Sequence, residues 1–148
     1  MRRALRHADG ILIGTPEYHG SFSGVLKNAI DHMGFAEFEG KMVGLIGVSG
    51  GRMGATIALN SLHTIARALH AWVVPEQASI PEAWRNFDKD GNSKQEDLEK
   101  RLLGVGRQVA RFAFLHTSDK TRDFLRAWEQ AFENPGGGQE VELASQTA

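Results

Sequence analysis

The chain has 148 residues, of which 41% are hydrophobic and 24% charged, and this composition indicates one α/β-sized globular domain with its own core. Its 17 lysines and arginines nearly balance its 18 aspartates and glutamates, so no overall positive field favours nucleic acid or an anionic membrane as a partner. The lack of cysteine excludes disulfides, thiolate metal sites and thiol nucleophiles, and because it fits a reducing compartment we expect a cytoplasmic protein. The apolar runs are far shorter than the roughly 20 residues of a membrane-spanning helix.

Apolar runs alternate along the chain with segments of helical periodicity. The basic residues 1–7 lack the apolar core of a signal peptide, and we interpret them as the end of a helix. The expected strands cover residues 10–14, ended by Pro16, residues 41–48, and a Pro-interrupted region comprising 72–74 and 78–80. The expected helices cover residues 21–32, a segment with the apolar face Ala58, Leu62, Ile65 and Leu69, and a long segment from a capping box at 93–96 through Phe112. This alternation predicts a parallel sheet with helices on both faces.

The C-terminal part contains one more expected helix, over residues 119–133. Phe124, Trp128 and Phe132 recur every fourth residue there, so their aromatic face needs a partner. A proline and three glycines then end the ordered chain. We therefore expect a single domain over residues 1–133 and a disordered tail over 134–148.

Two loops follow the first two strands, and ligands of open parallel sheets bind beyond the carboxyl ends of strands. In the first loop, residues 15–21, Pro16 fixes a bend and Tyr18 offers an aromatic face with a polar tip. In the second, residues 49–54, three glycines clear side chains away and leave backbone amides free near a helix N-terminus. These features suit a flat ligand with polar edges, although the same residues also serve simply to turn a chain.

The sequence TPEYHGSFSGVLKNAID, residues 15–31, closely resembles the TPEYNGS…GxLKNAID signature of the NADPH-dependent FMN reductase family. Residues 8–11, ADGI, and 49–54, SGGRMG, are similar to that family in the same order and at similar spacing. The resemblance covers roughly residues 4–116. It implies a flavodoxin-like fold, FMN as the cofactor and NADPH as a transient electron donor.

The resemblance also implies which residues contact the flavin, because in the family the first loop packs against the ring and ribityl chain and the second forms another wall. The implied cofactor-binding residues are Pro16, Glu17, Tyr18, His19, Ser49, Gly50, Gly51, Arg52 and Met53. His19 stands where the family usually has asparagine, and imidazole forms hydrogen bonds with a different geometry. No catalytic side chain and no metal ligand is implied, since the flavin carries the chemistry. Lys27, Asn28 and Asp31 belong to the same signature and are expected to be structural, and Arg52 is a candidate contact for a nicotinamide phosphate.

The resemblance begins late, which predicts an N-terminally truncated member that lacks the first βαβ unit. Family members start with a strand and a Ser/Arg-rich loop that holds the FMN phosphate. Without that loop we expect weakened FMN binding, and without that strand we expect residues 11–13 to form an exposed apolar edge. A start site placed too late, a complementing partner and a rearranged fold all remain open as explanations.

The function implied by the resemblance is a flavin-dependent oxidoreductase that passes hydride from NAD(P)H to FMN and then electrons to a quinone or similar small-molecule acceptor. A homodimer or homotetramer is expected from the family, with the aromatic face around Trp128 as a possible contact surface. The missing phosphate loop motivates an alternative from another class, an inactive flavodoxin-like interaction or dimerisation module.

A serine hydrolase is a further alternative. Residues 47–51 fit G-x-S-x-G between a strand and a helix, and Asp88 or Asp90 with His116 follow Ser49 in a suitable order. Against it, His116 is expected at the end of a long helix and the chain is short for that fold. Residues 88–92 are interpreted as a solvated turn rather than a calcium loop, and His63 and His70 as surface or packing residues.

Overall fold

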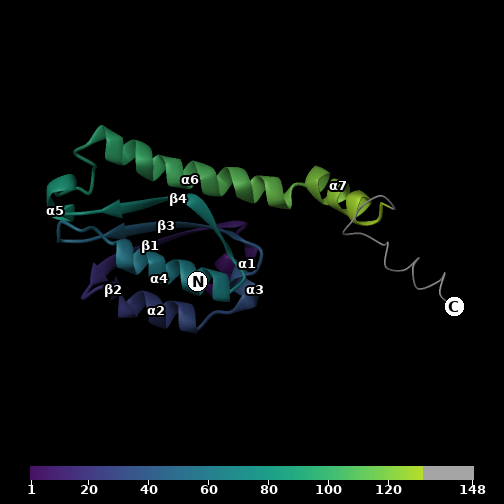
Figure 1. Ribbon diagram of the computed structural model, residues 1–148, viewed down its shortest axis with the longest axis horizontal. Helices are drawn as coiled ribbons and strands as arrows, with labels where there is room; N and C mark the ends of the chain where they lie inside the picture. The colour runs from purple at the N-terminus through teal and green to yellow at the C-terminus, as the bar shows by residue number, and fades with distance from the viewer. Residues whose placement is uncertain (132–148) are drawn as a thin grey trace. The chain divides into compact units, whose positions relative to one another are not determined.

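The computed structural model describes residues 1–131, and the chain divides into one unit from Met1 to Ala113 and another from Phe114 on (Figure 1). The first unit contains α1 (Arg2–His7), β1 (Gly10–Tyr18), β2 (Ser21–Phe22), α2 (Gly24–Asp31), α3 (Phe35–Phe38), β3 (Met42–Val48), α4 (Thr56–Ala68), β4 (Trp72–Ile80), α5 (Ala83–Asn86) and most of α6 (Glu96–Thr117). The end of α6 and α7 (Asp119–Glu129) belong to the second unit. No helix in residues 1–131 is both long enough and apolar enough to span a membrane.

The sheet has the strand order β2-β1-β3-β4. β1 and β3 pair in parallel from Gly10 opposite Met42 to Pro16 opposite Val48, and β3 pairs in parallel with β4. The two residues of β2 pair antiparallel with the end of β1. The predicted strand–helix alternation is therefore confirmed, with a short antiparallel addition.

Helices cover both faces of the sheet, as the sequence predicts (Figure 1). Leu59 and Leu62 of α4 share one buried cluster with Val43 of β3, and α2 lies on this same face. On the other face, Val109 of α6 packs with Met42 of β3 in a second cluster. Burial of these apolar side chains is the main source of the fold's stability.

β1 is longer than the sequence indicates, because it continues through Pro16 to Tyr18. The expectation that Pro16 ends the strand is wrong. Over residues 10–16, β1 pairs on one side only, with β3, so Pro16 has no second neighbour that requires its missing N–H. Ile11 and Ile13 are buried on the sheet's face, whereas Leu12 is 54% exposed. Of the three apolar side chains expected to be exposed at this edge, residues 11–13, only that of Leu12 is therefore exposed.

Two helix starts also differ from expectation. Ser21 and Phe22 form β2 instead of helix, and α2 begins at Gly24, where Ser23 Oγ accepts a hydrogen bond from Leu26 N at 3.2 Å. At α6, the expected capping box does not form, because Ser93 Oγ accepts from Gln95 N and the helix begins after it. In both places a local side chain to backbone bond decides where the helix starts.

The third strand region is continuous. β4 runs through the proline at position 75, and a register shift relative to β3 lies between Val43 and Leu45, so the interruption expected in this strand is wrong. Gln108 Oε1 of α6 accepts from Glu76 N at 3.1 Å on this edge strand. Prolines are tolerated at edges and irregularities of this kind.

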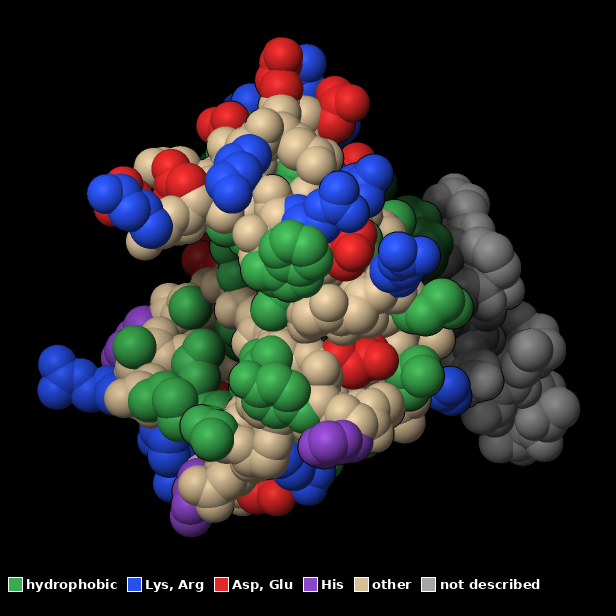
Figure 2. All heavy atoms as spheres, turned by 90° about the vertical axis from the view of Figure 1, so that its left-hand side faces the viewer, with side chains coloured by type: hydrophobic (Ala, Val, Ile, Leu, Met, Phe, Trp, Pro, Cys, Tyr) green, Lys and Arg blue, Asp and Glu red, His purple; other side chains and the backbone are tan. Residues whose placement is uncertain are grey.

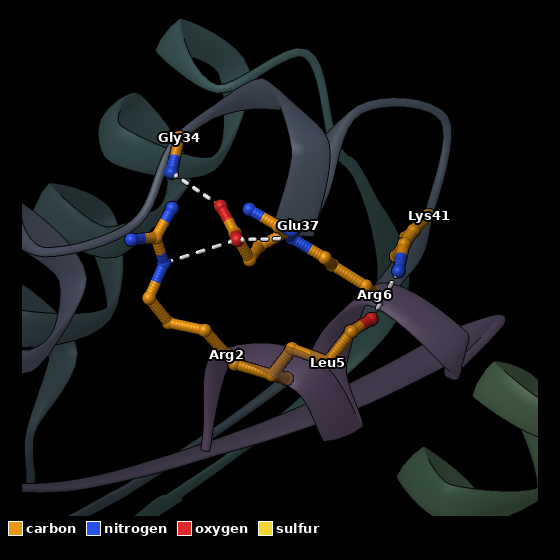
Figure 3. Close-up of polar contacts among 6 residues, drawn as sticks. All are labelled: Arg2, Leu5, Arg6, Gly34, Glu37 and Lys41. Atoms are coloured by element: carbon orange, nitrogen blue, oxygen red, sulfur yellow. Dashed lines mark hydrogen bonds and ion pairs between the residues drawn. The ribbon is translucent and has the colours of Figure 1, made fainter.

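α1 is attached to α3 by a buried carboxylate (Figure 3). Glu37 Oε1 accepts from Arg6 Nε at 2.8 Å and from Arg2 Nε at 3.1 Å, while its Oε2 accepts from Gly34 N at 2.9 Å. The Gly34 amide, followed by the two arginines, lowers the pKa of Glu37 to about 2. Lys41 Nζ donates to Leu5 O nearby, and burial lowers the pKa of Lys41. These contacts join the predicted N-terminal helix to the domain.

In the second unit, α7 confirms the helix expected after residue 118. Ser118 Oγ caps it by accepting from Thr121 N at 3.3 Å, and the side chain of Phe124 is 66% exposed. The helix ends at Glu129, short of the expected residue 133. Phe132 and the tail expected over 134–148 lie outside the described residues, and the single domain over 1–133 stays a prediction.

Candidate functional site

Both predicted loops lie at the carboxyl end of the parallel sheet. β1 and β3 run in parallel and end beside each other, with Pro16 opposite Val48, so the residues that follow them share one rim. Figure 2 shows this end of the molecule, where hydrophobic side chains reach the surface. Tyr18 of the first loop is 62% exposed and Met53 of the second is 90% exposed. The sequence prediction that these two loops meet at one edge is confirmed.

The first loop is a tight hairpin rather than an irregular strand-to-helix connection. Tyr18 pairs with Ser21, and the two residues between them, His19 and Gly20, have φ of 53° and 76°. Two central residues with positive φ define a type I′ turn, for which Asn-Gly is the favoured sequence. His19 is therefore held in a left-handed conformation and exposed to solvent.

Thr15 anchors this hairpin, although the sequence analysis did not assign it a role. It is 3% exposed, and its Oγ1 donates to Pro16 O at 2.9 Å and accepts from Ser23 N at 3.1 Å. The hydroxyl therefore connects β1 to the start of α2. Two signals in the sequence point to it: Thr15 begins the signature of residues 15–31, and it continues the period-two pattern of Ile11 and Ile13.

Glu17 connects the first loop to the helix that follows the second. Its Oε2 accepts a hydrogen bond from the backbone N–H of Ala58, in the first turn of α4, at 2.9 Å. A carboxylate at a helix N-terminus satisfies an unpaired amide and interacts favourably with the helix dipole. Glu17 thus fixes the hairpin against α4, and its contact with a flavin remains a prediction.

The second loop is held by backbone bonds to the end of β4. Ser49 N donates to Ile80 O at 2.8 Å, and Ser49 Oγ accepts from Gly51 N at 3.0 Å. The expectation that the amide of Gly51 is free is therefore wrong. Gly54 has φ of 70° and lies so close to Ser79 that a Cβ at position 54 would collide with the serine hydroxyl.

Other backbone amides of this loop are open. Among residues 1–131, the N–H groups of Gly50, Arg52 and Met53 have no hydrogen-bond acceptor. They lie at the same rim of the sheet as Tyr18, which is exposed, in a loop that leads into the N-terminus of α4. Exposed amides that share a rim with an exposed aromatic side chain fit a flat ligand whose edge carries carbonyl oxygens and ring nitrogens.

The family model for NADPH-dependent FMN reductase matches residues 1–85, a span that includes both loops. The chain belongs to the NADPH-dependent FMN reductase family. The resemblance of residues 15–31 and 49–54 to that family is thereby confirmed. The edge of an isoalloxazine ring carries carbonyl oxygens and ring nitrogens, which are the kind of acceptor that the open amides of the second loop require.

One curated relative and two solved structures agree with this assignment. The chain is 42% identical over 95 residues, 64% of its length, to an FMN-dependent NADPH-azoreductase of Staphylococcus aureus. It resembles the structure of FerB, a flavoenzyme NAD(P)H:(acceptor) oxidoreductase from Paracoccus denitrificans, with a TM-score of 0.56 and 32% identity over 78% of this chain and 66% of that one. It also resembles a flavodoxin, WrbA-like protein from Agrobacterium tumefaciens, with a TM-score of 0.58 and 25% identity over 78% of this chain and 72% of that one. The fold is therefore flavodoxin-like. The match spans about half the length of the Staphylococcus relative, 50%.

The serine hydrolase alternative finds no support at Ser49. Within the described residues its hydroxyl has no hydrogen bond to a histidine, and its Oγ instead accepts from Gly51 N. Asp88, one of the two acids proposed for a triad, is engaged in a turn: the side chain of Asn92, with the amides of Asn92 and Asp90, lowers the pKa of Asp88. Neither observation supports a triad around Ser49.

Four other polar residues singled out from the sequence, Lys27, Asp31, His63 and His70, have structural contacts. Lys27 and Asp31 form an i,i+4 ion pair on α2 at 2.7 Å. His63 Nε2 lies 3.0 Å from Gln77 Oε1, and the His70 ring stacks on Phe35 with its Nδ1 near Glu39. The interpretation of these histidines as packing or surface residues is confirmed.

Proposed function

We propose that the protein is a flavin-dependent oxidoreductase that takes hydride from NAD(P)H and delivers electrons to a small-molecule acceptor. The observation that carries the proposal is the common rim of the two loops, which the Glu17 to Ala58 hydrogen bond holds together. Family membership supplies the identity of the cofactor, FMN. Bound there, FMN would supply the acceptor of hydride and the donor of electrons.

The chain's own residues bind and orient the ring. The amides of Gly50, Arg52 and Met53 are the donors that its edge needs, and Tyr18 with Pro16 provides the apolar surface. His19 at the hairpin tip and Ser49 and Gly51 at the base of the second loop complete the proposed contacts. No side-chain acid or base takes part, because hydride transfer to a flavin requires orientation and an open ring face rather than proton abstraction.

The acceptor is proposed from the relatives. One is described as an azoreductase and another as an NAD(P)H:(acceptor) oxidoreductase, so quinones and azo compounds are the small molecules to test first. A cytoplasmic homodimer or homotetramer completes the proposal. The exposed aromatic side chains of α7, Phe124 among them, are its proposed contact surface.

Titration of the purified chain with FMN, followed by quenching of flavin fluorescence, tests the proposal. We expect saturable binding with one FMN per chain, weakened about 5-fold or more by Tyr18→Ala because stacking on an aromatic ring contributes about 1–3 kcal/mol. Trp72→Ala is the matched control, since Trp72 is an exposed aromatic residue at the opposite, amino-terminal end of β4.

Bound FMN that NADPH reduces and a quinone reoxidises would complete the support. A folded chain that binds no FMN would refute the oxidoreductase and favour the inactive interaction module. Circular dichroism of the same sample distinguishes this outcome from an unfolded chain.

A further inference from the structure

A cavity of about 550 Å³ lies beside the second loop, at the carboxyl end of β4. Two backbone hydrogen bonds join its lining residues to that loop, Ser49 N to Ile80 O and Glu82 N to Gly51 O, and Ala83 N, which follows Glu82 in sequence, donates to Ser49 O. The wall of the cavity is therefore hydrogen-bonded directly to the proposed flavin loop. The volume lies within the range of small-molecule and cofactor sites, roughly 300–1,000 Å³.

Two arginines line this cavity. Arg85 is oriented by Glu82, whose Oε2 lies 3.3 Å from Arg85 Nη1, and by the ring of Trp84, 5.6 Å from its guanidinium carbon. Arg101 also lines the cavity, and among residues 1–131 its guanidinium has no hydrogen bond or ion pair. A planar guanidinium without a partner binds phosphate oxygens with paired hydrogen bonds.

The cavity also presents acceptors, so its lining is not simply basic. Glu82 and Asp97 line it together with Asn86. Asn86 is 8% exposed and its Nδ2 donates to Pro81 O at 2.7 Å, while its Oδ1 accepts no hydrogen bond from any residue in the range 1–131. Figure 2 shows the same mixture, with acidic and basic side chains close together at this end of the molecule. A ligand that fits must offer both an anionic group for the arginines and donors for the oxygens.

A phosphorylated nucleoside meets these requirements. Its phosphate suits Arg85 and Arg101, while ribose hydroxyls and an adenine amino group can donate to the oxygens of Glu82, Asp97 and Asn86. A bare inorganic anion would be repelled by the two carboxylates, and a cation by the two arginines. The mixed lining thus favours a nucleotide over either simple ion.

We propose that this cavity binds the phosphorylated adenosine half of the nicotinamide donor, and that Arg85 and Arg101 select the 2′-phosphate of NADPH over the free hydroxyl of NADH. The inference rests on the proposed function, because the other half of the donor has to reach the neighbouring flavin loop. It assigns cofactor preference to residues outside both loops.

Calorimetric titration of the full chain with 2′,5′-ADP tests the inference, with 5′-AMP as the comparison ligand. We expect 2′,5′-ADP to bind more tightly than 5′-AMP, and Arg101→Gln to weaken its binding by about 10- to 100-fold, the range for a lost hydrogen bond to a charged group. Arg107→Gln is the matched control, because Arg107 lies on the same helix and does not line the cavity. Arg101 is the decisive position, since substitution of Arg85 also breaks its ion pair with Glu82.

FMN titration of the same variants separates this inference from the proposed function. Unchanged FMN binding in Arg101→Gln, together with a lower preference for NADPH over NADH, supports the inference. Arginine-dependent binding of 2′,5′-ADP by a chain that binds no FMN would support a nucleotide site and refute the oxidoreductase. Absence of 2′,5′-ADP binding at millimolar concentration, or equal affinity in Arg101→Gln and wild type, overturns the inference whatever FMN does.

Discussion

Glu17 Oε2 accepts a hydrogen bond from the backbone N–H of Ala58 at 2.9 Å, across 41 residues of sequence. Through it, the hairpin after β1 and the helix after the second loop hold each other in place. The carboxylate lies on the proposed flavin rim, and its Oε2 is bound to the backbone of α4. Its first role is thus to set the distance between the two loops.

Replacing Glu17 with alanine should lower both stability and FMN affinity. The substitution removes an acceptor at a helix N-terminus, which typically costs about 1 kcal/mol, so the urea midpoint should fall. Glu17→Gln keeps an acceptor oxygen without the charge and should fall between wild type and Glu17→Ala in both measurements. Equal FMN affinity in all three proteins would show that the bond does not position the loops.

Substitution of His19 tests the backbone of the hairpin. Its φ of 53° lies in the left-handed region, which asparagine adopts at a lower free-energy cost than most other residues with a side chain. We expect His19→Asn to raise the free energy of unfolding by up to about 1 kcal/mol, measured by urea denaturation. His32→Asn is the matched control, because His32 has φ of −84° and should gain nothing from the change. A destabilised His19→Asn protein would mean that the imidazole makes a contact beyond the turn.

The sequence predicts the parallel sheet and its helices well, because buried strands and amphipathic helices leave regular apolar patterns. It also places the two loops at one rim, since parallel strands end at the same edge. It misplaces the strand end at Pro16, because tolerance of a proline depends on whether the strand has one neighbour or two, which no local pattern records. It also misplaces the start of α6, because Ser93 Oγ accepts a hydrogen bond from Gln95 N and does not cap the helix.

The site is predicted less completely than the fold. The bond from Glu17 to Ala58 joins segments far apart in sequence, so neither segment alone indicates it. The cavity with Arg85 and Arg101 depends on how the end of β4 and the start of α6 meet. Arginines in a polar stretch of sequence look like ordinary surface residues until the tertiary structure brings them to one cavity.

Glu37 should make the stability of the domain depend on pH in the acid range. Its side chain is 1% exposed, and its pKa of about 2 in the folded protein lies below the 4.5 of an unperturbed glutamate. At pH values well above 4.5 the carboxylate is charged in both the folded and the unfolded protein. Its contacts with Gly34, Arg6 and Arg2 then contribute their full stabilisation to the fold. As the pH falls from about 5 to about 2 the unfolded chain binds the proton first, so this contribution is lost progressively.

Urea denaturation of wild type and Glu37→Gln at a series of pH values measures this dependence. Glu37→Gln should be less stable than wild type at pH 7, and the difference between the two proteins should shrink towards zero near pH 2. Other carboxylates titrate in the same range, so the comparison uses the difference and not either curve alone. Glu76→Gln serves as the control, because Glu76 is exposed and its carboxylate has no ion pair among the described residues, and its curve should run parallel to wild type. A Glu37→Gln curve that also ran parallel to wild type from pH 7 to pH 2 would show that the buried carboxylate has the same pKa in the folded and unfolded states.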